Sequence, residues 1–115
     1  MPNELANTLF QTFTGAAAIA ETLAPKAKFR LVRVEVHLSA APTTSQSLTI
    51  TLDAGDGATY DTLLYTNDLS VTSVTDLVVE FGEGYEYEYD DEIDIAYTNT
   101  DVRTISGRYV YELEK

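Results

Sequence analysis

The chain of 115 residues contains no cysteine and no tryptophan, and it has only three prolines and one histidine. Without cysteine, neither a disulfide nor a thiolate metal site can contribute to the fold. Long apolar runs are also absent, because the most apolar early stretch, residues 16–24, is interrupted by Glu21 and is too short to span a bilayer. We therefore expect one small domain with a single core and no membrane span.

Positive charge is scarce and unevenly placed. Nineteen acidic residues stand against seven basic ones, for a net charge of −12, and neither lysine nor arginine occurs from residue 34 to residue 102. A basic cluster precedes this stretch and consists of Lys26, Lys28, Arg30 and Arg33. An acidic surface of this extent repels phosphate backbones and anionic lipids, so we expect neither a nucleic-acid partner nor a membrane partner.

Motifs of catalysis are missing as well. The sequence has no glycine-rich phosphate loop, no Gly-x-Ser-x-Gly elbow and no His-x-x-x-His pair. The single histidine, His37, falls on the polar side of an alternating segment beside Glu35 and Arg33. Because no residue nearby is marked as a nucleophile, we interpret His37 as a surface residue. We predict that the protein is not an enzyme and needs no cofactor.

What the chain has in abundance is alternation with a period of two. Apolar Val32, Val34, Val36 and Leu38 alternate with polar residues, the pattern of a half-buried strand. Turn residues such as Ala54-Gly55-Asp56-Gly57 separate further β-prone runs. These runs cover residues 10–13, 47–53, 60–65, 76–81, 85–89, 92–97 and 105–113. Seven to eight short strands predict an all-β fold, a two-sheet β-sandwich of jelly-roll or immunoglobulin-like type.

The N-terminal quarter is less regular. Residues 1–9 show little periodicity, and we predict a mobile or partner-bound arm there, followed by a single sandwich domain over residues 10–115. Residues 15–24 are rich in alanine and allow either a helix or a strand. The β-prone segments on both sides favour the strand.

Two acidic segments are candidate binding sites. Asp53, Asp56 and Asp61 are weak calcium candidates in a glycine-containing loop, although their spacing differs from an EF-hand and a simple hairpin turn explains them better. In the second segment, Tyr85, Tyr87 and Tyr89 share one side of a predicted strand and glutamates share the other. These tyrosines face either the core or the solvent, where they would form an interface or stack on sugar rings.

Three segments carry a family resemblance. They are LSAAPTTSQSLTITLD at residues 38–53, YDTLLY with DLS at residues 60–65 and 68–70, and DEIDIAYTNTD at residues 91–101. Over about residues 28–110 the chain resembles short structural proteins of tailed bacteriophages. The resemblance implies a non-enzymatic virion protein, made in the host cytoplasm, that decorates or cements the capsid by binding the major capsid protein. A carbohydrate- or receptor-binding module and a tail or neck adaptor are the alternatives.

The expected partner surface lies at the basic end. The basic cluster adjoins the arm, so we predict that this end meets an acidic partner surface while apolar arm residues add buried area. The residues predicted to bind are Leu5, Leu9, Phe10, Lys26, Lys28, Arg30 and Arg33. In a competing interpretation, the basic residues only balance acids of the same chain. We also expect self-association, as a homotrimer in preference to a dimer, because capsid lattices offer three-fold positions.

Overall fold

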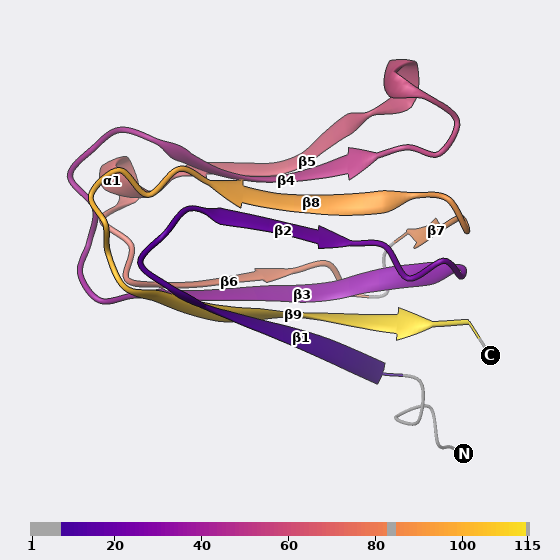
Figure 1. Ribbon diagram of the computed structural model, residues 1–115, viewed down its shortest axis with the longest axis horizontal. Coiled ribbons are helices and arrows are strands. Elements are labelled where there is room, and N and C mark those ends of the chain that lie inside the picture. The colour runs from indigo at the N-terminus through magenta and orange to yellow at the C-terminus, as the bar shows by residue number, and fades with distance from the viewer. Residues whose placement is uncertain (1–7, 83–84, 115) are drawn as a thin grey trace.

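The computed structural model describes residues 8–82 and 85–114, which form two antiparallel sheets that face each other (Figure 1). Sheet A has the order β1 (Thr8–Gly15), β9 (Ile105–Leu113), β3 (Phe29–Leu38) and β6 (Asp76–Glu80), and the short β7 (Glu86–Tyr87) pairs with the beginning of β3. Sheet B has the order β2 (Ile19–Leu23), β8 (Glu92–Tyr97), β4 (Ser47–Asp53) and β5 (Thr62–Asp68). The predicted all-β sandwich is confirmed.

The strands pair like one long hairpin folded over on itself. β4 pairs with β5, β3 with β6 and β7, β2 with β8, and β1 with β9, so each pair encloses the one before it. β6 and β7 lie one after the other along the same edge of β3 and together take the place of one strand. This nesting is a jelly-roll topology, which decides between the two sandwich types that the sequence left open.

The core fills the space between the sheets with the apolar faces of the alternating strands. Val34, Leu38, Leu48 and Ile50 are fully buried, as the period-two pattern predicts. The rings of Phe29 and Tyr87 lie 5.3 Å apart at one end of this core. Each fully buried aliphatic or aromatic side chain contributes about 1.5–3 kcal/mol, so this layer is the main source of stability.

A β-bulge in β3 overturns one detail of the predicted alternation. The pairing of β3 with β9 shifts register between Leu31 and Arg33. Leu31 therefore faces the core, whereas Val32, which we predicted on the same side as Val34, is only half-buried. A bulge adds one residue to the strand and reverses the alternation beyond it, which periodicity alone does not reveal.

The structure also revises several boundaries. Thr8 and Leu9, predicted in the arm, are the first residues of β1, while residues 1–7, including Leu5, lie outside the described residues. Part of the alanine-rich segment is strand β2, as preferred. β5 begins at Thr62 because a 3-10 turn, η2 (Ala58–Tyr60), precedes it. The short helix α1 (Leu69–Thr72) was not predicted; it begins where the Asp68 carboxylate accepts a hydrogen bond from Ser70 N.

Candidate interaction face on sheet A

The outer face of sheet A is a grid of side chains contributed by strands in register. Alternation turns these residues outward, because their neighbours Tyr109 and Tyr111 on β9 and Val34 and Val36 on β3 are buried. Cross-strand pairing sets four rows: Phe10–Val110–Arg33–Glu80, Thr12–Arg108–Glu35–Val78, Thr14–Ser106–His37–Asp76 and Thr8–Glu112–Arg30–Glu86. We call this surface the A face.

Ion pairs link the strands across the A face. Glu35 lies at the centre, with Arg33 Nε at 2.8 Å and Arg108 Nε at 3.0 Å from its two carboxylate oxygens. Arg33 also lies 3.4 Å from Glu80, and Arg30 lies 3.2 Å from Glu112. Partly exposed pairs contribute about 1 kcal/mol or less each, so their main effect is to hold the charged groups in fixed positions.

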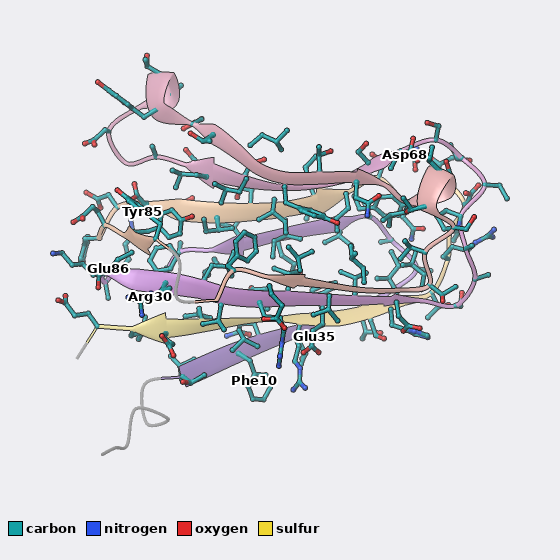
Figure 2. The ribbon with its side chains drawn as sticks, turned by 180° about the vertical axis from the view of Figure 1, so that it is seen from behind. Phe10, Arg30, Glu35, Asp68, Tyr85 and Glu86 are labelled. Carbon is teal, nitrogen blue, oxygen red and sulfur yellow. The ribbon has the colours of Figure 1, made fainter. Side chains whose placement is uncertain are left out.

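Apolar side chains lie between these charges. Phe10 is 57% exposed and Val78 is 55% exposed. The Arg108 guanidinium lies 5.3 Å from the centroid of the Phe10 ring, a cation–π contact. Figure 2 shows Phe10 pointing outward from β1, on the side away from sheet B. An open depression of about 480 Å³ lies among residues that include Thr12, Glu35, His37, Asp76, Val78 and Arg108.

One corner of the depression brings together residue types used in nucleophilic catalysis. His37 Nδ1 lies 2.6 Å from Asp76 Oδ1, and Ser106 is the cross-strand neighbour of His37 on β9. Within the described chain, however, no hydrogen bond joins Ser106 to His37, and the side chains of His37 and Asp76 are both more than half exposed. A nucleophile needs contact with its base in a site shielded from water, so we interpret this group as a surface hydrogen-bonded pair.

The structure divides the residues predicted to bind a partner. Phe10, Arg30 and Arg33 share the A face. Leu9 projects from the other side of β1, opposite Tyr111. Lys26 and Lys28 lie in the β2–β3 loop instead.

Each of the four clustered basic residues has an acidic neighbour in the same chain. Lys26 lies 3.7 Å from Asp90, and Lys28 lies 4.0 Å from Glu88. Arg30 and Arg33 belong to the pairs of the A face. This geometry favours the competing interpretation, in which these residues balance acids of their own chain.

Sequence reasoning missed Arg108, Glu35 and Glu112 as part of this surface. Glu35 was placed on the polar side of its segment, Arg108 and Glu112 were assigned to no surface, and only the pairing of β3 with β9 shows that the three are neighbours. To predict this grouping from the sequence, one would need to know that residues 29–38 pair with residues 105–113.

The acidic loop between β4 and β5 is a hydrogen-bonded turn. The Asp61 carboxylate accepts from Ala54 N at 2.9 Å, and Gly55 N donates to Asp91 at 2.9 Å. These bonds tie the loop to the turn before β8. In residues 8–82 and 85–114, no group of three or more histidine, aspartate or glutamate side chains is arranged to hold a metal ion. The structure therefore does not gather the calcium candidates Asp53, Asp56 and Asp61 into such a group.

The three tyrosines predicted to share one face are separated. Tyr87 on β7 is 6% exposed, whereas Tyr85 and Tyr89 on either side of it are 69% and 57% exposed. The strand predicted over residues 85–89 is only the two-residue β7, so alternation does not extend to its neighbours. Tyr85 still contacts the Tyr87 ring edge-on, with the centroids 5.1 Å apart.

Polar contacts fasten the loops at the end of the sandwich where α1 lies (Figure 1). The Asp101 carboxylate accepts from Thr43 N and Thr44 N, each at 2.8 Å, and from Thr44 Oγ1 at 2.6 Å. These hydrogen bonds, that of the Thr44 hydroxyl foremost, lower the pKa of Asp101 to about 2. Buried Asn99 donates to the backbone oxygens of Ala16, Ala17 and Arg103 at 3.0–3.1 Å. We assign this cluster a structural role, because its polar groups satisfy one another.

No family model, no curated protein and no solved structure matches the chain. No helix in the described part of the sequence is long and apolar enough to cross a membrane. Fold and surface together define a jelly-roll domain with a charged, aromatic-bearing sheet face.

Proposed function

We propose that the chain is a non-enzymatic structural protein of a tailed-phage particle, which decorates or cements the capsid by binding the major capsid protein through the A face. The observation that carries the proposal is the composition of this face. Three of the seven basic residues of a strongly acidic chain, Arg30, Arg33 and Arg108, project from it beside exposed Phe10 and are held in place by ion pairs with acids of the same chain.

The chemistry of the A face suits binding to a broad protein surface. Aromatic and arginine side chains carry much of the binding energy in protein interfaces, and both types are exposed here. The alternating arginines and glutamates supply orientation and partner choice more than net affinity. Phe10 and Val78 add apolar area that a partner would bury.

The sequence resemblance supports the phage assignment. The segments that carry it, residues 38–53, 60–65, 68–70 and 91–101, supply β4, β8 and most of β5 in sheet B and the loops beside them. They therefore belong to the scaffold of the jelly roll, and the A face lies on the opposite sheet. In this proposal the scaffold is shared with other phage proteins and the A face selects the partner.

A binding experiment with capsids tests both parts of the proposal. Capsids of the phage that encodes the chain, prepared without it, should bind the purified protein saturably in a cosedimentation assay. Arg108→Ala and Val78→Ser should each weaken binding about tenfold, a loss of about 1.4 kcal/mol. Asp94→Ala, which removes a charge from the outer face of sheet B, is the control and should bind normally.

The outcomes separate the face from the function. Failure of the unaltered chain to bind capsids would contradict the capsid role. Normal binding by both A-face variants would contradict the choice of face. Cryo-EM of the particle then locates the protein, and density at the tail or neck in place of the capsid would support an adaptor.

A carbohydrate- or receptor-binding role is the second candidate, and the exposed tyrosines favour it. Tyr85 and Tyr89 flank β7, and exposed Tyr60 belongs to the loop that Gly55 ties to Asp91. Aromatic rings presented to solvent can stack on sugar rings. A glycan array probed with the chain tests this role, and a signal abolished by Tyr85→Ala and Tyr89→Ala would establish it over the capsid proposal.

A further inference from the structure

Within the described residues, strand β1 is an open sheet edge without the usual protection. Among the described residues it pairs with β9 on one side only, and all eight of its residues keep register without a bulge. Its sequence, TLFQTFTG, contains neither a charge nor a proline. Edge strands usually carry charges, prolines or bulges, or are very short, because a free row of N–H and C=O groups pairs readily with another strand.

The other edges of the two sheets each carry such a protection. β2 has five residues, including Glu21. The edge formed by β6 and β7 is interrupted and carries acidic residues at Asp76, Glu80 and Glu86. β5 contains a register shift opposite β4 and ends at Asp68. In the part of the chain that the structure describes, β1 is the edge that is long, regular and uncharged.

The first half of β1 exposes apolar side chains on both of its sides. Phe10 is exposed on the A face. Leu9 points to the same side as Phe13 and Tyr111, which contact or belong to the core, yet it is 39% exposed. Figure 1 shows that β1 runs obliquely away from sheet B toward its N-terminal end.

We propose that β1 pairs antiparallel with β1 of a second copy of this chain, about a two-fold axis that joins two A sheets into one continuous sheet. Identical strands match in length, and their neutral sequence lets two chains of net charge −12 meet where neither carries an acid. The Arg108 guanidinium over Phe10 places positive charge next to the seam, which offsets the remaining repulsion.

The geometry of strand pairing restricts the register. Directly opposed residues of an antiparallel pair lie on the same side of the sheet. Phe10 therefore meets Thr8, Phe10, Thr12 or Thr14 of the second copy, and in the same four registers Leu9 meets Leu9, Gln11, Phe13 or Gly15. A strand that pairs with itself closes at two copies, so this arrangement replaces the homotrimer expected from the sequence.

The contact is one strand wide, at the small end of protein interfaces. We therefore expect association that depends on concentration, with a dissociation constant of about 1–100 μM. Sedimentation velocity of the full chain from about 1 μM to about 500 μM should show a species of twice the 12.7 kDa chain mass. Hydrogen exchange over the same range should slow at alternate amides of β1 as the dimer forms.

Thr12→Glu tests the pairing without endangering the fold. Thr12 is opposite Arg108 on β9, so the new carboxylate gains a partner within its own chain. In the dimer, the same substitution adds one negative charge from each copy to the seam between two acidic chains, and we expect the dissociation constant to rise at least tenfold. Thr66→Glu is the matched control: it adds the same charge to the edge strand β5, opposite Thr49, and should leave the dimer unchanged.

Several results would overturn this inference. They are a monomer over the whole concentration range, a three-chain species, and equal weakening by Thr12→Glu and Thr66→Glu. The experiment needs no capsid, so its failure leaves the proposed function standing, and failure to bind capsids leaves the dimer standing.

Discussion

At the scale of single residues, the hydrogen bonds that the Asp101 carboxylate accepts make the stability of the fold sensitive to acid. The folded pKa of about 2 lies below the ordinary value of 3.8. Because folding lowers the pKa, the ionised carboxylate stabilises the fold fully at pH values above the pKa of the unfolded chain. This contribution is lost as the pH falls through about 2. Asp68 acts in the same direction, since the Ser45 hydroxyl, followed by that of Ser70, lowers its pKa.

Asp101→Asn should therefore flatten the acid limb of the stability profile. We expect a lower melting temperature than the unaltered chain at about pH 7 and a smaller fall between about pH 5 and about pH 2. Thermal unfolding followed by circular dichroism across this range measures both effects. Asp56→Asn is the control, because Asp56 is exposed. An acid limb of unchanged slope in Asp101→Asn would contradict the assignment.

Gly107 is required by a close approach of strands. A Cβ at this position would overlap the backbone oxygen of Glu35 and lie 2.7 Å from Phe13 Cζ. Gly107→Ala should lower the free energy of unfolding by about 2–4 kcal/mol, because the obstacle on β3 is backbone and cannot rotate away. Ser106→Ala, one residue earlier and exposed, should stay within about 0.5 kcal/mol. Urea unfolding compares the two, and equal midpoints would show that the strands can separate at no cost.

At the scale of elements, Glu35 couples β3 to β9 through its contact with Arg108. Glu35→Gln removes the charge that Arg33 and Arg108 share. We expect the free energy of unfolding to fall by about 1 kcal/mol at low ionic strength, and by less at high salt because salt screens the ion pairs. Urea unfolding at low and high salt measures the difference. Among the described residues, Glu80 makes one ion pair, which is longer and more exposed, so Glu80→Gln should lower the free energy of unfolding by less. A larger effect of Glu80→Gln than of Glu35→Gln would contradict the central role of Glu35.

Alternation predicted the elements well wherever one side of a strand is buried. The bounds of β4, β8 and β9 agree with the prediction to the residue, since each presents a clear apolar side to the core. Prediction was wrong at Val32, where a bulge reverses the alternation, and at Tyr85 and Tyr89, which lie outside β7. A period of two indicates which side of a strand is buried, but it does not indicate where a strand ends or where it contains a bulge.

The A face was predicted only in fragments for a related reason. Phe10, Arg30 and Arg33 were singled out, but their grouping with Lys26 and Lys28 followed from closeness in sequence. The structure groups them by strand pairing instead, with Arg108 and Glu112 from a segment more than seventy residues later. Pairing between distant strands depends on the whole fold, so no local pattern contains it.

At the scale of the whole molecule, the net charge of −12 opposes compaction. Added salt should raise the melting temperature, because screening of the excess acids outweighs the weakening of the pairs on the A face. Calcium and magnesium chloride at equal ionic strength should raise it equally. Differential scanning calorimetry measures both. A larger rise with calcium, abolished by Asp56→Asn or Asp61→Asn, would show that the acidic loop binds this ion after all.

The nested pairing of the strands has a consequence for the order in which the protein is made. β9 lies between β1 and β3, and β8 lies between β2 and β4, so the last two strands to be synthesised complete both sheets. Among the described strands, β1 and β2 have no partner until β8 and β9 leave the ribosome, and only the pairs around β4–β5 and β3–β6 can form before then. We expect stalled nascent chains to remain open to protease until β8 and β9 have emerged, and to become resistant in one late step.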